Sequence, residues 1–249
     1  MEDGSAMIKV LYEDNHLLCV EKPVNVPVQP DGSGDVSMLD LCKDYLKTAY
    51  NKPGNVFCGL VHRLDRPVGG AMVFAKTSKA ASRLSETIRT HKMIKAYMAV
   101  IEGVPDKEED TLIDYLVKDP RTNRVSVTDA KHGKKSFLSY RVLGTRNGKS
   151  LVMIELGTGR PHQIRVQFSS RGWPLVNDQR YNPHAGRGQI ALWAWHLEFP
   201  HPVRKETVAV ESLPPCTAPW DLFKEELYDE EEEEKEETSF SDPSSAASE

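Results

Sequence analysis

Two segments in the middle of the chain place apolar residues at every second position, which is the pattern of a strand with one buried face. In residues 136–142, Leu138, Tyr140 and Val142 share one face, and residues 150–156 follow the same spacing. Short apolar runs predict six further strands, at residues 8–12, 17–21, 57–61, 71–75, 97–102 and 190–199. The chain is therefore expected to be rich in strands.

Three segments carry helix signals. Ser37 is a preferred N-cap residue, and Cys42 and Leu46 follow it at helical spacing. Residues 78–90 predict a second helix, and residues 161–171 predict a third with proline in its first turn.

The order of these elements is neither a regular strand–helix alternation nor a series of hairpins. It predicts an α+β fold: one domain over residues 8–220, with a mixed, mostly antiparallel β-sheet flanked by helices and loops. No GxGxxG motif follows a predicted strand, which argues against a Rossmann sheet and against a nucleotide cofactor. Hydrophobic residues make up 39% of the chain, which excludes a wholly disordered protein.

The charge of the chain is divided unevenly between its body and its C-terminal end. The 249 residues have a formal net charge of −5. Residues 221–249 hold thirteen acidic side chains and two lysines, a charge of −11, which leaves +6 for residues 1–220. A basic body suits a nucleic acid, whose binding should weaken as salt rises. The acidic end lacks apolar periodicity and predicts a disordered tail, either a solubilising end or a competitor of nucleic acid for the body.

Neither the cysteines nor the apolar segments indicate export or membrane insertion. The four cysteines include no CxxC pair, and a secreted disulfide scaffold would be denser. The sequence contains no recognisable secretory leader and no apolar run near the roughly 20 residues that span a bilayer. It predicts a soluble, cytoplasmic protein with no membrane partner. Residues 1–7 are expected to be an N-terminal extension outside the fold, either natural or introduced by cloning.

The first polar segment with candidate chemistry is His62–Arg66, which lies between two apolar runs. In it, Asp65 has Arg63 and Arg66 as close neighbours. Such a cluster is common on solvated surfaces, where it only pairs charges. In the alternative, functional interpretation the guanidinium groups hold the carboxylate ionised while the apolar flanks withdraw it from water, so that it can act as a nucleophile or base. The spacing alone leaves both interpretations open.

Two more segments could contribute to a site. Tyr97, at the start of a strand, either packs in the core or lies against a flat substrate with its hydroxyl near the reacting centre. In Gly157–Val166, a glycine-rich turn enters the predicted helix, whose first N–H groups and Arg160 could contact an anion. If that helix forms, His162 and Arg165 share a face.

Together the three segments resemble motifs of the RluA family of pseudouridine synthases. His62–Arg66 is similar to the HRLDR motif of that family, Lys95–Tyr97 to its KxY strand, and Gly159–Arg165 to its GRTHQIR segment. The motifs occur in the same order, and the resemblance covers residues 8–213.

The resemblance implies the pseudouridine synthase fold and the conversion of a specific uridine in structured RNA, ribosomal or transfer, to pseudouridine. The N1–C1′ bond breaks, the uracil turns and C5 bonds to C1′, so neither a cofactor nor a metal is expected. Asp65 would be the essential carboxylate, Arg165 would pair with it, and Tyr97 would lie against the uracil. Five further residues would hold the nucleotide, contact phosphate or form the pocket rim: His62, Arg63, Arg66, Arg160 and His162.

Two departures from the family pattern keep a second function open. Pro67–Gly70 replaces a turn that usually carries Thr and Ser, and Pro161 replaces a Thr. Both change hydrogen bonding near the expected site, so the main alternative is a non-catalytic RNA-binding protein with the synthase fold. A glycosidic hydrolase would need two paired carboxylates, and the site segments offer one. A zinc deaminase would need a PCxxC segment, and Cys216 has no second cysteine three residues on.

Overall fold

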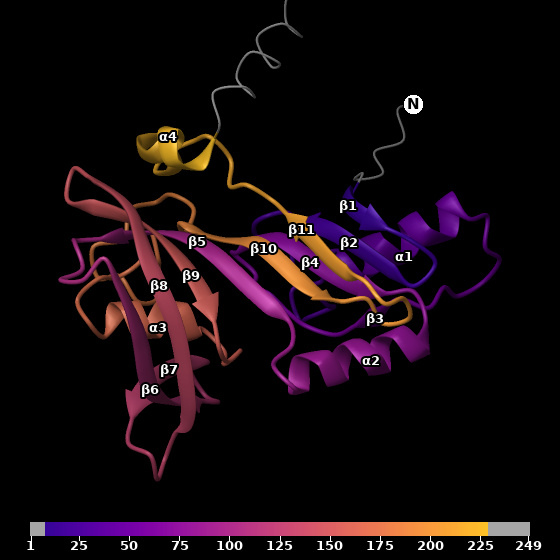
Figure 1. Cartoon of the computed structure of the whole chain (residues 1–249), viewed down its shortest axis with the longest axis horizontal. Helices are drawn as coiled ribbons and strands as arrows, with labels where there is room; N and C mark the ends of the chain where they lie inside the picture. The colour runs from indigo at the N-terminus through magenta and orange to yellow at the C-terminus, as the bar shows by residue number, and fades with distance from the viewer. Residues whose placement is uncertain (1–7, 229–249) are drawn as a thin grey trace, which may run out of the picture.

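The computed structural model describes residues 8–228, which form an eleven-stranded mixed sheet with helices on its faces (Figure 1). Neighbouring strands follow the order β1-β2-β4-β10-β5-β9-β8-β6-β7, with β3 paired to β4 and β11 to β10. Only β4 and β10 pair in parallel among the strands of the described residues. The predicted α+β fold with a mixed, mostly antiparallel sheet is confirmed. The strands are β1 (Lys9–Glu13), β2 (Leu17–Lys22), β3 (Gly59–Leu60), β4 (Gly69–Ala75), β5 (Ile94–Glu102), β6 (Glu109–Asp119), β7 (Arg124–Thr128), β8 (Lys134–Arg146), β9 (Lys149–Leu156), β10 (Leu192–Pro200) and β11 (Thr207–Glu211).

Three helices contribute to the body of the molecule: α1 (Met38–Ala49), α2 (Ser78–Arg89) and α3 (Gln163–Ser169). Ser37 caps α1 as predicted, because its hydroxyl accepts from the N–H of Asp40 while the Asp40 carboxylate accepts from the N–H of Ser37. α2 begins after Thr77, whose hydroxyl accepts from a first-turn N–H in the same way.

The central strands alternate their side chains between two apolar cores. In β2, Leu18 and Val20 belong to the core that includes α1, whereas Leu17 and Cys19 belong to the core that includes α2. All four side chains have no exposed area. A strand buried on both faces is apolar at every position, so this part of the sheet is held rigidly by both layers.

Strand β10 joins the two halves of the sheet. It pairs in parallel with β4 through Ala194 and Gly70, and in antiparallel fashion with β5 over residues 192–198. A Cβ atom on Gly70 would lie 2.2 Å from the carbonyl oxygen of Ala194, so only glycine allows this close approach. The loop with Asp65 leads directly into β4, and Tyr97 lies on β5. β10 therefore lies between the strands that position these two residues.

Several predicted boundaries were wrong. The charged hairpin of β6 and β7 and the short strand β11 were not predicted, and only Gly59–Leu60 of the predicted strand 57–61 is paired. α3 begins at Gln163, two residues after the predicted start, because His162 has a left-handed backbone with φ of 51°. A helix cannot include such a residue in its first turn.

The predicted disorder from Asp221 onward is also wrong for its first residues. Trp220–Phe223 form a 3-10 turn, η1, and Lys224–Leu227 form the short helix α4. Trp220, Phe223 and Leu227 are buried in a third apolar cluster with side chains of β5 and β10. Residues 1–7 and 229–249, which hold the predicted extension and the rest of the predicted tail, lie outside the described residues. Within residues 8–228, no helix is long and apolar enough to cross a membrane.

Candidate active site

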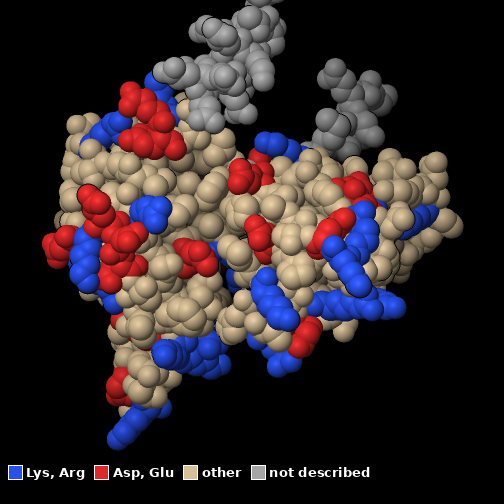
Figure 2. Space-filling model, viewed as in Figure 1, with Lys and Arg blue, Asp and Glu red and all other residues tan. Residues whose placement is uncertain are grey.

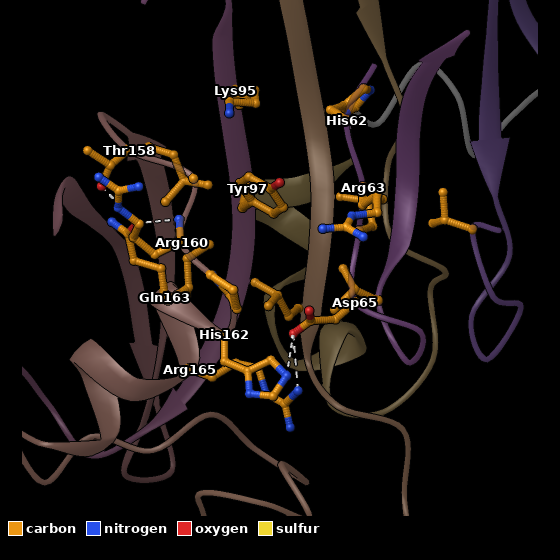
Figure 3. Close-up of a pocket in the computed structure, with 18 of the residues that line it drawn as sticks. His62, Arg63, Asp65, Lys95, Tyr97, Thr158, Arg160, His162, Gln163 and Arg165 are labelled. Carbon is orange, nitrogen blue, oxygen red and sulfur yellow. Dashed lines mark hydrogen bonds and ion pairs between the residues drawn. The ribbon is translucent and has the colours of Figure 1, made fainter. Parts of the chain in front are cut away.

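The three predicted segments line one cavity of about 1740 Å³ (Figure 3). The loop between β3 and β4 brings Asp65 to it, β5 brings Tyr97, the turn from β9 into α3 brings His162, and α3 brings Arg165. Residues of the β6–β7 hairpin form another wall. Side chains far apart in the sequence therefore meet in one cavity, as the motifs predict.

Asp65 and Arg165 form the predicted ion pair. Nη1 of Arg165 lies 3.1 Å from Oδ2 of Asp65. The Asp65 side chain remains 29% exposed, whereas that of Arg165 is only 6% exposed. The contacts of the carboxylate to Arg165 and His162 both involve Oδ2, while Oδ1 points away from them, toward the side where Tyr97 lies (Figure 3). One carboxylate oxygen is thus held by the protein and the other faces the cavity.

Asp178, which the sequence analysis missed, fixes the guanidinium of Arg165. Its two oxygens lie 2.8 Å from Nε and 2.7 Å from Nη2 of Arg165, a bidentate pair with no exposed area on the Asp178 side chain. Burial alone would lower the pKa of Arg165, but the hydrogen bonds and charge of Asp178 raise it. Arg165 is therefore a charged, pre-oriented donor. No motif marked Asp178; the only signal is an acidic residue two positions after the apolar pair Leu175 and Val176.

Lys22 is a second residue that the sequence analysis did not assign. Its amino group is fully buried at the end of β2 and donates to the carbonyl oxygens of Pro23 at 2.9 Å, Arg66 at 2.9 Å and Val68 at 2.7 Å. Burial lowers its pKa to about 7, while the charge of Asp65 opposes this change. The N–H of Val68 donates to the carbonyl of Asp65 at 3.0 Å, so Lys22 holds the turn that carries the carboxylate. A lysine at the end of an apolar strand was the available signal.

Tyr97 lies in β5 with its ring on the wall of the cavity (Figure 3). Its side chain is nearly buried, at 8% exposure. Burial, and then the negative charge of Asp65, raise the pKa of the Tyr97 hydroxyl above its ordinary value of 10. The hydroxyl is therefore protonated at neutral pH. Lys95, two positions earlier on the same strand, also lines the cavity, and burial lowers its pKa.

His162 lies beside Asp65, although its place in the secondary structure differs from the predicted one. The prediction placed it on a helix face with Arg165, whereas it precedes α3 with a left-handed backbone. Its Nε2 lies 3.9 Å from Oδ2 of Asp65, and its Nδ1 lies 2.7 Å from the hydroxyl of Tyr181. Burial lowers the pKa of His162, although the charge of Asp65 opposes this, so the ring is neutral at pH 7. The predicted proximity of His162 to the site agrees with this geometry, but the predicted helical position does not.

Two of the predicted substrate-binding residues are bound to the protein itself. Nε2 of His62 accepts from the N–H of Val73 in β4 at 3.0 Å, and burial lowers the pKa of His62 to about 3. Arg66 donates to the carbonyl of Asn25, to Ser33 and to the carboxylate of Asp35. Both residues therefore help to hold the walls of the cavity, and Arg66 keeps little donor capacity for a ligand.

The other two predicted binding residues face solvent at the cavity. Arg63 and Arg160 are exposed and line it (Figure 3). Arg160 uses Nε to donate to the carbonyl of Lys135 at 3.3 Å, and its N–H donates to the side chain of Gln163 at 3.0 Å. Its guanidinium nitrogens Nη1 and Nη2 form no hydrogen bond with any of residues 8–228. These two arginines are the anion contacts that the geometry supports.

The cavity contains nine Lys or Arg side chains and three Asp or Glu side chains. This excess of basic side chains creates a positive potential, which attracts a polyanion. No group of three His, Cys, Asp or Glu side chains within residues 8–228 is arranged to hold a metal ion. The site combines the carboxylate of Asp65 with the aromatic wall of Tyr97 and a basic surround.

The family described as RNA pseudouridylate synthase matches residues 16–170, a range that includes Asp65, Tyr97 and Arg165. The chain belongs to this family. The predicted resemblance to RluA-type synthases and the predicted enzyme class, an RNA pseudouridine synthase, are confirmed.

Individual relatives of this synthase agree with the assignment. An uncharacterised RNA pseudouridine synthase of Zymomonas mobilis is 31% identical over 215 residues, which are 83% of this chain and 94% of that protein. Ribosomal large subunit pseudouridine synthase D of Nitrosomonas europaea is 31% identical over 216 residues, but the chain spans only 61% of its length. The human RNA pseudouridylate synthase domain containing 1 has the same fold, with a TM-score of 0.71 at 23% identity over 97% of this chain and 98% of that one.

Proposed function

We propose that this synthase converts a uridine in ribosomal RNA to pseudouridine and that Asp65 is its essential carboxylate. The observation that carries the proposal is the half-paired carboxylate: Arg165 holds Oδ2 while Oδ1 faces a cavity walled by Tyr97. The reaction breaks the N1–C1′ bond and forms a C5–C1′ bond, the C5 proton leaves and N1 gains a proton. The atoms therefore balance without any co-reactant.

The role of each side chain follows from its position in the site. Arg165, itself held by Asp178, orients Asp65 and opposes its protonation by charge. Three chemical roles are open to Asp65: attack on the sugar, attack on the base, or removal of a sugar proton. The ring of Tyr97 would lie against the uracil, and its protonated hydroxyl suits hydrogen bonding better than proton abstraction. The nucleotide must leave its stack to reach this depth, at a cost of a few kcal/mol.

The basic surround supports RNA as the substrate. Lys and Arg side chains occupy the lower edge of the molecule in Figure 2, over the arm of β6–β8 and near α2. Arg63, Arg160 and Lys118 line the cavity on exposed positions. Phosphate contacts of this kind position a nucleic acid without reading its sequence. The name of the Nitrosomonas relative favours ribosomal RNA, with transfer RNA as the alternative substrate.

We also propose that residues 8–228 form the catalytic domain and that the protein acts in the cytoplasm. The upper boundary moves from the predicted residue 220 to Tyr228, because Phe223 and Leu227 pack in the core. A non-catalytic RNA-binding protein remains the rival function. The altered turn Pro67–Gly70 that motivated it is held by Lys22 and continues into β4 at Gly69, which favours the enzyme.

The test combines mapping with a matched pair of variants. Pseudouridines mapped in total RNA with and without the gene identify the target site, and purified protein is then assayed on that RNA. Asp65→Asn keeps the size of the side chain and should abolish product, a loss of at least about 10⁴-fold, while RNA affinity stays close to that of the unsubstituted protein. Asp44→Asn, an exposed substitution on α1, should leave the rate unchanged. RNA that is bound but unmodified by the unsubstituted protein would leave only the rival function.

A further inference from the structure

The hydroxyl of Tyr181 lies between two hydrogen-bonding groups at the back of the cavity. It accepts from the backbone N–H of Val125 in β7 at 2.9 Å, and it lies 2.7 Å from Nδ1 of His162. The Tyr181 side chain is nearly buried, at 7% exposure. Neither sequence motif nor family pattern above assigns Tyr181 a role.

These contacts decide which nitrogen of His162 carries the proton. A phenol hydroxyl has one proton, and that of Tyr181 already accepts from Val125, so it satisfies both neighbours best by donating to Nδ1. A neutral imidazole that accepts at Nδ1 carries its proton on Nε2. Nε2 lies 3.9 Å from Oδ2 of Asp65, and an N–H there attracts the carboxylate, whereas a lone pair would repel it.

We propose that Tyr181 is a positioning residue: its hydroxyl holds His162 as the Nε2–H tautomer, so that His162 and Arg165 both direct N–H groups at Oδ2 of Asp65. The consequence is that Oδ1 stays directed at the substrate. This inference rests on the proposed role of Asp65.

The charged groups around His162 support a neutral ring with a fixed tautomer. Asp65 faces it from the β3–β4 loop, Arg165 from α3, and Asp178 and Arg180 from the segment before β10. The two arginines disfavour an imidazolium, and Asp178 is already occupied by Arg165. The Tyr181 hydroxyl therefore determines which ring nitrogen of His162 carries the proton.

The same tyrosine connects the β6–β7 hairpin to the site. Its ring contacts two guanidinium groups, since Cζ of Arg124 and Cζ of Arg165 each lie 5.2 Å from the ring centroid. Nη1 of Arg180, the preceding residue in the chain, donates to the carbonyl of Asn123 at 2.7 Å. Because residues 122–124 also line the cavity, a nucleic acid that contacts the hairpin contacts the support of His162.

The first test reads the tautomer directly in the full chain. Protein labelled with 15N at its eight histidines is examined by NMR, and the signal of His162 is assigned as the one that a His162→Gln variant lacks. We expect a protonated Nε2 and an unprotonated Nδ1 at pH 7. A protonated Nδ1 in the unsubstituted protein would overturn the proposal without any assay of activity.

The second test removes only the hydroxyl. In Tyr181→Phe, Nδ1 loses its donor, so both tautomers become populated and His162 becomes easier to protonate. We expect a kcat lower by about 10- to 100-fold, a KM for RNA close to that of the unsubstituted protein, and an acid limb of the pH–rate profile shifted to higher pH. Tyr228→Phe is the matched control, because its hydroxyl donates to the carbonyl of Pro214 at 2.7 Å in another part of the molecule.

The two tests separate this inference from the proposed function. An inactive unsubstituted protein with an Nε2–H His162 would defeat the role of Asp65 and leave the tautomer assignment standing. An active Tyr181→Phe protein with an unchanged rate and pH profile would defeat the positioning role and leave Asp65 standing. Loss of RNA affinity without a change in kcat would also contradict the positioning role.

Discussion

The residues of the candidate site are each positioned by a neighbouring side chain. Asp65 is held by Arg165, Arg165 by Asp178, and the turn below Asp65 by the amino group of Lys22. Of these four residues the sequence motifs predicted Asp65 and Arg165, because both belong to patterns with recognisable spacing. Asp178 and Lys22 carry only weak signals in the sequence, since their importance comes from burial and from contacts to segments distant in the chain.

The substitution Lys22→Met tests the support of the catalytic turn. Three carbonyl oxygens, one in a buried and two in part-buried hydrogen bonds, would lose their donor, so we expect the free energy of unfolding to fall by about 2–4 kcal/mol. The turn that carries Asp65 would also lose an anchor, so the rate should fall even where the protein is folded. Urea unfolding and a pseudouridine assay measure the two effects.

The control for that substitution is Lys9→Met. Lys9 pairs with Glu21 on the same hairpin, but its side chain is 66% exposed. Exposed pairs of this kind contribute little to stability. Equal stability of the two variants would contradict the role given to Lys22.

Whether a strand could be predicted from the sequence depended on whether one of its faces is buried and apolar. Strands with a buried face, such as β8 and β9, follow the apolar spacing of the sequence. β6 was missed because its exposed face also carries the apolar residues Ile113 and Val117, so its sequence lacks a clear alternation, and β7 is only five residues long. α3 begins later than predicted because the backbone of His162 is left-handed, and this conformation brings the imidazole to Asp65.

The turn between β1 and β2 carries a prediction about pH. Oδ1 of Asp14 accepts from the N–H groups of His16 at 2.7 Å and Leu17 at 2.8 Å, and Oδ2 lies 2.8 Å from Nε2 of His201. Burial opposes ionisation, but these hydrogen bonds outweigh it and lower the pKa of Asp14 to about 2. A carboxyl with a lowered pKa stabilises the fold above its ordinary value near 3.8, and this contribution is lost as the pH falls toward 2.

We therefore expect Asp14→Asn to remove a pH-dependent contribution of about 2 kcal/mol. The stability curves of the two proteins should be separated at pH 6 and converge as the pH falls from 4 to 2. Unfolding by urea at a series of pH values measures this. A constant separation across that range would contradict the assignment to Asp14.

For the whole molecule, the C-terminal helices belong to the folded body. Trp220, Phe223 and Leu227 cover Trp193 of β10 and Val100 of β5, and Arg146 forms ion pairs with Glu225 and Glu226. A chain that ends at Pro219 would expose this cluster. We expect its melting temperature to fall by roughly 10 °C, in proportion to the apolar area lost.

A chain that ends at Tyr228 is the control for this truncation, because it keeps every contact of residues 8–228. Differential scanning calorimetry compares the two with the full chain. If the chain that ends at Pro219 melts at the same temperature as the full chain, the cluster contributes nothing to thermal stability. Residues 229–249 carry ten acidic side chains and one lysine, so removing them alone also separates the effect of charge from that of packing.

The continuous pairing of β4, β10 and β5 has a consequence for which uridines can react. Asp65 lies in the loop that enters β4 and Tyr97 lies on β5, so the pairing of β4, β10 and β5 limits how far the gap between them can widen. The enzyme therefore resists opening to admit a paired base, and the RNA must supply the movement. Uridines in hairpin loops, bulges or weakly paired junctions should therefore be modified faster than the same uridine locked in a long duplex.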